Sequence, residues 1–222
     1  VSTMAFEPGN PNVIYVGSGE GVLGTESDTL GDFRGAGIFK TIDGGATWAR
    51  LEQTKSDSFF YINDIVVSSV DKNRVYAATR NGVWRSLDAG ANWSQLFDAK
   101  GGSTTFQRGC LDLAIRANQQ NDVLFASCGN FEQGAVFRNP AADGSGAWTS
   151  VLSESGMGRT ELAISPSNPD VIYALASSIE RNDFTYSLFA VYRSAAAGVD
   201  GSWTAQVRNT NANKINRAIL SI

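Results

Sequence analysis

The 222-residue chain has no histidine, and this absence excludes several kinds of chemistry. Ser-His-Asp triads, Cys-His pairs and histidine-ligated metal sites all need an imidazole, so none of them can be built within this chain. Basic residues are also few: 18 Lys and Arg stand against 22 Asp and Glu, the net charge is −4, and no basic run occurs. Nucleic acid is therefore not an expected partner, because neutralising phosphates takes clustered Lys and Arg. No apolar run is long enough to span a bilayer, so we expect no membrane span.

Cysteine is scarce as well, with Cys110 and Cys128 the only two in the sequence. They lie at the start and the end of a predicted strand hairpin, where antiparallel pairing can bring two side chains within bonding distance. The alternative is a pair of small, buried, apolar side chains. The sequence leaves both interpretations open.

What the chain does contain is an octapeptide that occurs twice, at 41–48 and 86–93. Both copies read hydroxyl, any residue, Asp, any residue, Gly, any two residues, Trp. In a tight turn, the Asp accepts hydrogen bonds from backbone N–H groups, the Gly takes a positive φ angle and the hydroxyl closes the other side. The Trp then starts the next strand and buries a large ring.

The repeat extends beyond this octapeptide. Segments 5–16, 66–77, 114–126 and 163–174 align as a strand, a polar turn and a second strand. Degenerate octapeptides follow at 139–148, where Asp143 and Trp148 keep the Asp-to-Trp spacing, and at 194–203, where Ser194 and Trp203 remain. Tryptophan thus recurs about every 50 residues, a spacing suited to four short antiparallel strands per repeat.

The octapeptide resembles the Asp-box, or BNR repeat, of sialidases, sortilin-type receptor domains, xyloglucan-cleaving glycosidases and photosystem assembly factors, which are all β-propellers. The sequence GSGEG at 17–21, followed by a Gly-rich loop and the octapeptide, is most similar to sortilin-like, BNR-containing exported proteins of bacteria. The resemblance implies that the box residues hold turns and take no part in catalysis. These structural residues are Thr41, Asp43, Gly45, Trp48, Ser86, Asp88, Gly90, Trp93, Asp143, Trp148 and Trp203.

The predicted fold class is all-β: a β-propeller of four-stranded antiparallel blades with almost no helix. The chain is expected to be a single, partial propeller domain with blades at about 1–52, 60–97, 109–152 and 160–207, and with 213–222 starting a further blade. The sixteen strands are expected at 3–7, 13–17, 37–41, 48–52, 64–68, 74–79, 82–86, 93–97, 111–116, 123–128, 135–138, 148–152, 161–165, 171–176, 188–194 and 203–207.

Asp-box propellers usually have six or more blades, so four blades are expected to leave the propeller incomplete. Either the natural protein continues, or two chains form a homodimer through their open propeller edges. The chain has neither an initiator Met nor a signal peptide, which favours a fragment or a mature domain. The similarity to exported proteins implies a secreted or periplasmic location.

In a propeller, the box turns lie on one face, and the loops around the channel mouth lie on the other. Two of these mouth loops, at 18–35 and 178–186, are long and acidic, and long loops often carry function. Their carboxylates could form a glycosidase pair, bind calcium or line a solvated rim, and these alternatives stay open. The weak catalytic candidates are Glu20, Glu26, Asp28, Asp32, Glu180 and Asp183.

A sialidase-like site would need arginines to hold a substrate carboxylate, and Arg159 is one of several arginines near the mouth loops. The candidate ligand-binding side chains are Arg34, Arg80, Arg108, Arg181 and Tyr186. Segments 8–15 and 37–48 resemble xyloglucan-cleaving enzymes more closely. The early strand that carries an Asp in those enzymes reads TMAFE here, at 3–7.

The leading hypothesis is a binding or scaffold module that engages a protein, a peptide or a glycan through the mouth loops, without cofactor or metal. A strong scaffold signature without an identifiable catalytic set motivates it. The alternative is a fragment of a glycoside hydrolase, of xyloglucanase or sialidase type, that uses loop carboxylates.

Overall fold

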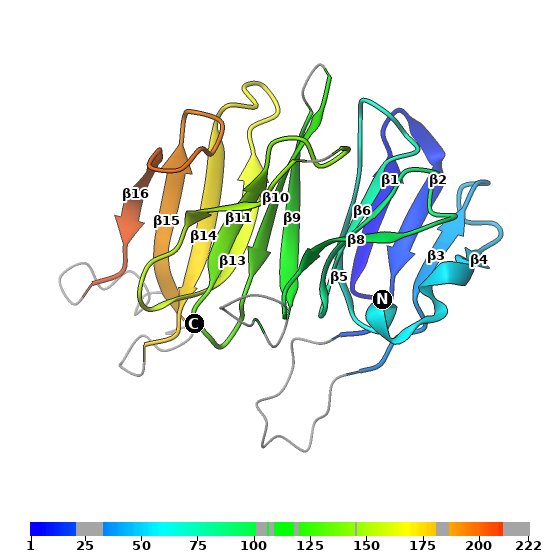
Figure 1. Cartoon of the computed structure of the whole chain (residues 1–222), viewed down its shortest axis with the longest axis horizontal. Helices are drawn as coiled ribbons and strands as arrows, with labels where there is room; N and C mark the ends of the chain where they lie inside the picture. The colour runs from blue at the N-terminus through cyan, green and yellow to red at the C-terminus, as the bar shows by residue number, and fades with distance from the viewer. Residues whose placement is uncertain are drawn as a thin grey trace.

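A computed structural model of the chain describes residues 1–20, 33–100, 106, 109–117, 120–144, 146–180 and 187–210. The predicted start of a further blade, 213–222, lies outside these residues. The described strands form four antiparallel sheets, each of four strands that are consecutive in the sequence (Figure 1). The fold is therefore all-β, as predicted.

The strand bounds follow the chain order. Sheet 1 contains β1 (Thr3–Glu7), β2 (Asn10–Gly17), β3 (Ile38–Thr41) and β4 (Ala49–Arg50). Sheet 2 contains β5 (Ile62–Val67), β6 (Val75–Thr79), β7 (Gly82–Ser86) and β8 (Ser94–Asp98). Sheet 3 contains β9 (Cys110–Ala117), β10 (Asp122–Cys128), β11 (Ala135–Asn139) and β12 (Thr149–Leu152). Sheet 4 contains β13 (Met157–Ile164), β14 (Ile172–Ser178), β15 (Leu188–Ser194) and β16 (Trp203–Arg208).

The four sheets stand side by side, from sheet 1 at the right of Figure 1 to sheet 4 at the left. Their first strands are neighbours, because β1 contacts β5, β5 contacts β9, and β9 contacts β13. This arrangement of the described residues is an open, incomplete β-propeller. Its two ends are the outer faces of sheets 1 and 4.

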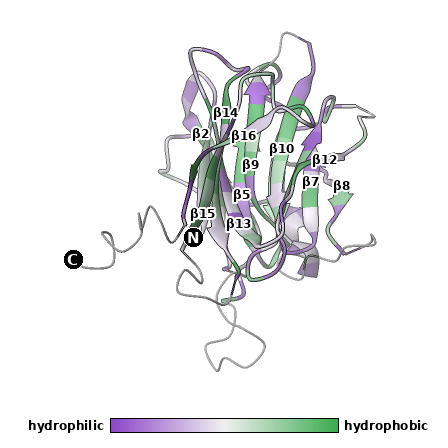
Figure 2. Ribbon diagram, turned by 90° about the vertical axis from the view of Figure 1, so that its left-hand side faces the viewer, coloured by the Kyte–Doolittle hydropathy of each residue, from purple (hydrophilic) through white to green (hydrophobic). Residues whose placement is uncertain are grey.

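Burial along the second strands follows from this stacking. Every residue of β10 is buried, because sheets 2 and 4 cover the two faces of sheet 3, and Figure 2 shows the hydrophobic residues along β9 and β10. In β14 the pattern alternates between buried and less buried positions, because only the face toward sheet 3 is covered. The apolar core is therefore a series of layers between sheets.

We call the face of each sheet toward the next sheet its front face, and the opposite face its back face. Between sheets 1 and 2, Tyr15 and Ile38 pack with Val75 and Ala77. Between sheets 2 and 3, Tyr76 and Ala78 pack with Leu113 and Leu124. Between sheets 3 and 4, the layer includes Phe125, Ile172 and Ala174.

The same polar contact crosses each of these three layers. A basic residue on the third strand of one sheet donates to a main-chain carbonyl in the octapeptide turn of the next sheet. Lys40 Nζ lies 3.0 Å from the Ala89 carbonyl oxygen, Arg85 Nη1 lies 2.9 Å from that of Ala142, and Arg138 Nε lies 3.2 Å from that of Ala197. We call this contact the turn clamp.

Helical structure is confined to two short 3-10 segments of the described chain, η1 (Glu52–Lys55) and η2 (Asp57–Phe59). The first of them shortens the fourth predicted strand, which ends at Arg50 and not at Glu52. None of the described residues forms a helix with the length and apolar character needed to cross a bilayer.

Cys110 and Cys128 form a disulfide, which decides between the two interpretations left open by the sequence. The two residues are direct partners in the ladder between β9 and β10, with their Cα atoms 3.9 Å apart. Both side chains are buried. The bond therefore joins the two strands at the end of the hairpin opposite its turn.

Replacing both cysteines with serine is expected to lower the free energy of unfolding by about 2–4 kcal/mol, the usual loss for a loop of this size. Urea unfolding of the variant and of the parent chain under oxidising conditions measures this difference. Equal stabilities would show that the ladder alone holds the hairpin.

Candidate functional site

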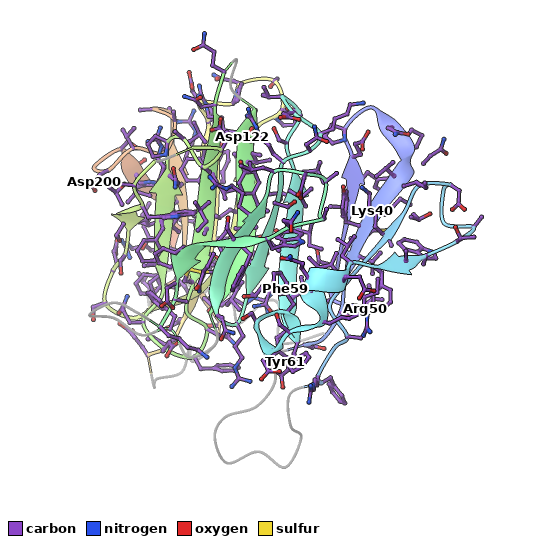
Figure 3. All side chains as sticks on the ribbon, turned by 45° about the vertical axis from the view of Figure 1, so that its right-hand side comes forward. Lys40, Arg50, Phe59, Tyr61, Asp122 and Asp200 are labelled. Atoms are coloured by element: carbon purple, nitrogen blue, oxygen red, sulfur yellow. A yellow bond between two sulfur atoms is a disulfide. The ribbon has the colours of Figure 1, made fainter. Side chains whose placement is uncertain are left out.

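The lower face of the molecule carries the loops between second and third strands and the loops between sheets. Figure 3 places Phe59 and Tyr61 at this lower end, whereas Asp122 lies toward the upper end with the octapeptide turns. The lower face is therefore the side on which the sequence predicted a binding site.

The base of the first mouth loop is fixed to the connection between sheets 1 and 2. Glu20 and Phe33 form an antiparallel bridge with N···O distances of 2.8 and 3.0 Å. The Gly35 N–H donates to the Phe60 carbonyl at 2.8 Å. Only glycine fits at position 19, because a Cβ there would lie 1.9 Å from the Phe60 oxygen. Main-chain contacts thus hold Glu20 in place.

A pocket of about 240 Å³ opens beside Glu20. Its lining comes from the two residues before β1, from the first residues of β5, β9 and β13, and from the first mouth loop, namely Val1, Ser2, Glu20, Asn63, Leu111 and Arg159. It therefore lies where the channel mouth of a propeller would be.

The polar groups of the pocket are oriented by neighbouring residues. Arg159 donates from Nε at 3.1 Å and from Nη2 at 2.7 Å to Glu161 Oε1. Asn63 donates from Nδ2 to the Cys110 carbonyl at 2.7 Å, which leaves its Oδ1 for another donor. A carboxylate, a carboxamide and a guanidinium thus line one pocket together with the buried Leu111.

Directly above the pocket, the inner strands carry an acidic column of Asp64, Asp112 and Glu161. The Leu113 N–H donates to Asp64 Oδ2 at 3.0 Å, and the Leu162 N–H donates to Asp112 Oδ2 at 2.6 Å. Each Asp therefore accepts a backbone hydrogen bond from the following sheet. Thr3 occupies the same position in sheet 1, and its hydroxyl donates to Asp64 Oδ1 at 3.0 Å.

Burial governs the protonation of this column. Burial, followed by the charge of Asp64, raises the pKa of Asp112 to about 8, although the Leu162 N–H opposes the shift. Burial also raises the pKa of Asp64. Asp112 is consequently protonated at neutral pH and can donate a proton or a hydrogen bond.

Two of the predicted ligand-binding arginines stack on aromatic rings of the lower face. The Arg34 guanidinium lies 3.5 Å from the centroid of the Phe60 ring, and the Arg80 guanidinium lies 5.1 Å from that of Tyr61. Stacking of this kind orients a guanidinium. Arg34 is exposed and next to Phe33, the bridge partner of Glu20.

Of the other predicted candidates, the structure describes only Glu180, which is not part of the pocket lining. Glu180 is exposed at the lower end of sheet 4, with its carboxylate beside Gly156. The remaining candidates lie outside the described residues: Glu26, Asp28, Asp32, Arg108, Arg181, Asp183 and Tyr186. No group of three or more Cys, Asp or Glu side chains in the described part of the chain is arranged to hold a metal ion.

The first two octapeptide turns lie on the opposite, upper face. Asp43 accepts from the Thr47 hydroxyl at 2.6 Å, from the Thr47 N–H at 2.9 Å and from the Thr41 hydroxyl at 2.7 Å. These hydrogen bonds, led by the one from the Thr47 side chain, lower the pKa of Asp43 to about 2. Asp88 makes the equivalent contacts with Ser86 and Asn92, which also lower its pKa.

The glycines and tryptophans complete these two turns. Gly45 and Gly90 both have a φ of 97°, and their carbonyls accept from the indole N–H groups of Trp48 and Trp93 at 3.0 Å. Trp93 packs in the layer between sheets 1 and 2, whereas Trp48 on the back face of sheet 1 is exposed.

The third turn differs from the sequence alignment. Asn139 pairs with β10 as Thr41 pairs with β2, so the turn starts two residues earlier than the spacing from Trp148 implied. Asp143 therefore does not hold this turn. It accepts from the Asp122 N–H at 3.1 Å and lies 3.2 Å from Arg74 of sheet 2.

The tryptophans of the third and fourth turns reach the layers between sheets. Trp148 donates to the Leu96 carbonyl of sheet 2 at 3.0 Å. Trp203 packs against the layer between sheets 3 and 4. In the fourth turn Ser194 accepts from the N–H groups of Ala196 and Gly198, so Ala196 stands where the first two turns have Asp.

Sequence reasoning did not select Asn63, Leu111, Asp64, Asp112 or Glu161. A signal for the acidic column was present, because the alignment of the four repeats puts Thr3, Asp64, Asp112 and Glu161 in one position. The pocket residues Ser2, Asn63 and Leu111 share the preceding position of the repeat, but their side chains have no common chemistry that would mark this position as a site.

No protein-family model matches the chain, and no curated protein matches it in sequence. Among solved structures it is similar to an ancestral GH74 enzyme, with a TM-score of 0.59 and 19% identity over 92% of this chain and 26% of the other. It is also similar to an extracellular domain assigned to a hybrid two-component system of B. thetaiotaomicron, with a TM-score of 0.57 and 11% identity over 96% of this chain and 22% of that one.

A third similar structure is an auxiliary nutrient binding protein from Bacteroides thetaiotaomicron, with a TM-score of 0.50 and 16% identity over 87% of this chain and 37% of that one. At such identities the likeness shows the propeller fold alone. The chain spans 26%, 22% and 37% of the lengths of these three proteins.

The raised pKa of Asp112 predicts a pH-dependent stability. The folded-state pKa of Asp112 exceeds the ordinary value of 3.8, so protonated Asp112 favours the folded state. This contribution to the free energy of unfolding is complete at low pH and is lost as the pH rises toward about 8. Asp64 changes the stability of the fold in the same direction. Asp43 and Asp88 have lowered pKa values, so their titration changes the stability only at pH values below this window.

Urea unfolding across this pH window is expected to show falling stability for the parent chain and a flatter profile for Asp112→Asn, which keeps an acceptor for the Leu162 N–H. Identical pH profiles for the two proteins would contradict the assignment of a protonated Asp112.

Proposed function

We propose that the chain is the ligand-binding part of a propeller and that it binds a glycan in the pocket between Glu20 and Arg159. One observation carries the proposal: the pocket lining combines a carboxylate, a carboxamide and a guanidinium with the apolar side chain of Leu111. Sugar hydroxyls donate to carboxylates and accept from guanidinium groups, and the apolar side of a sugar ring packs on residues such as Leu111.

The hydrogen-bonding capacity of the pocket supports this ligand class. Glu161 engages Nε and Nη2 of Arg159, so Nη1 remains for a ligand acceptor. Asn63 Oδ1 and the Glu20 carboxylate accept from ligand hydroxyls. A volume of about 240 Å³ has room for one sugar unit but not for a folded partner.

Arg34 and Arg80 extend this site along the lower face. Their stacking on Phe60 and Tyr61 combines aromatic surface with oriented positive charge. In this proposal they contact the units of a longer glycan that lie outside the pocket.

A location outside the cytoplasm belongs to the same proposal. The disulfide between Cys110 and Cys128 supports it, because such bonds persist in oxidising compartments.

Glycoside hydrolysis is the second candidate, and one observation favours it. Asp112 has a pKa of about 8, so it is protonated at neutral pH as a general acid must be. The Asp112 carboxyl, however, already accepts from the Leu162 N–H and lies within the column that joins the sheets. Binding is therefore the better-supported function.

The test is calorimetric titration of the chain with a panel of neutral and acidic oligosaccharides, with short peptides as a separate arm. Glu20→Gln is expected to weaken glycan binding about tenfold or more, since it removes a charged hydrogen-bond acceptor. Glu180→Gln is the matched control, because Glu180 is a lower-face glutamate outside the pocket lining, and it is expected to bind as the parent does.

Unchanged binding in Glu20→Gln, or binding of peptides alone, would contradict the proposal. Release of new reducing ends from the same oligosaccharides, abolished by Asp112→Asn with binding retained, would instead establish the hydrolase alternative.

A further inference from the structure

The front face of sheet 4 repeats a pattern that the other three sheets bury. The second strands align so that Tyr15, Tyr76, Phe125 and Tyr173 occupy one position. Tyr15, Tyr76 and Phe125 are each 0% exposed, because the following sheet covers them, whereas Tyr173 is 40% exposed. Leu175, two residues further along the same face, is 50% exposed.

The basic residue of the turn clamp is repeated as well. Lys40, Arg85 and Arg138 are the ladder partners of Tyr15, Tyr76 and Phe125, and Arg193 is the ladder partner of Tyr173. The first three donate to a turn carbonyl of the next sheet. The Arg193 guanidinium makes no hydrogen bond or ion pair with the described residues. Sheet 4 thus carries the donor half of a fourth clamp.

The acceptor half occurs on sheet 1. The turn residues that receive a clamp, Ala89, Ala142 and Ala197, each donate their own N–H to the turn between the first two strands of their sheet. Gly44 does the same, donating to the Asn12 carbonyl at 3.0 Å. Gly44 is therefore the equivalent residue of the first turn, and its carbonyl accepts no hydrogen bond within the described chain.

The back face of sheet 1 is apolar in the same way as the buried back faces. Met4 and Phe6 are 56% and 54% exposed, while Ile65 and Val67, which align with them in sheet 2, are 3% and 6% exposed. Trp48 adds a further exposed ring, whereas its equivalent Trp93 packs between sheets. Exposed apolar area of this kind marks an interaction surface.

We infer that the front face of sheet 4 docks onto the back face of sheet 1 in a second copy of this chain. The junction reproduces the three layers inside the chain: Tyr173 and Leu175 pack against Met4 and Phe6, and Arg193 donates to the Gly44 carbonyl. Glu161, the last member of the acidic column, faces the same junction. The contact is head-to-tail, so two copies related by a two-fold axis form two identical junctions and a closed dimer.

The experiment uses three variants of the full chain. Leu175→Arg places a charge on the front face of sheet 4, and Phe6→Arg places one on the back face of sheet 1. Leu87→Arg is the matched control, because Leu87 is also a 50% exposed leucine but lies in the octapeptide turn of sheet 2. Melting curves verify that each variant is folded, and sedimentation velocity measures association.

The parent chain and Leu87→Arg are expected to be dimers, and each of the other two variants is expected to be a monomer. An equimolar mixture of Leu175→Arg and Phe6→Arg is expected to form a heterodimer, because one intact front face meets one intact back face. Three results would each overturn the inference. They are a monomeric parent chain, dimers of both single variants, and a mixture of the two variants that forms no heterodimer.

Discussion

The turn clamp between a basic side chain and a main-chain carbonyl is the interaction on which the rest of this structure depends. Lys40, Arg85 and Arg138 each cross a layer between two sheets, and burial lowers the pKa of Lys40 and of Arg138. Unpaired, such a charge would be costly to bury. The clamp therefore fixes how each sheet is positioned on the next, while the apolar layer supplies most of the stabilisation.

The arrangement of the sheets that these clamps hold determines which residues of the first strands lie close together. Because β1, β5, β9 and β13 are neighbours, Asp64 and Asp112 can accept N–H groups from following sheets, and Asn63, Leu111 and Arg159 can line one pocket with Glu20. The octapeptide turns lie on the opposite face. The octapeptide turns and the pocket are thus separated by the height of the sheets.

The fold was predictable because its signals are local. Each well-formed turn encodes its own hydrogen bonds in eight residues, and the alternating strands between turns fix the sheet order, so β1, β7 and β15 start and end where the sequence predicted. Asp143 was misassigned because two additional residues separate the turn start at Asn139 from Trp148, so Asp143 keeps the Asp-to-Trp spacing without occupying the Asp position of the turn. The pocket was not predicted, because the repeat position that holds Ser2, Asn63 and Leu111 has no side-chain chemistry in common, and only the packing of different sheets brings these residues together.

The central claim is that the clamp stabilises the fold only where a following sheet supplies the carbonyl. The most direct test compares Arg85→Met with Arg193→Met in the Phe6→Arg background, in which copies are kept apart. Both substitutions remove a guanidinium from the same position of the repeat. The account predicts a loss of about 2 kcal/mol in the free energy of unfolding for Arg85→Met and a change within about 0.5 kcal/mol for Arg193→Met. Equal losses in the two variants would contradict it.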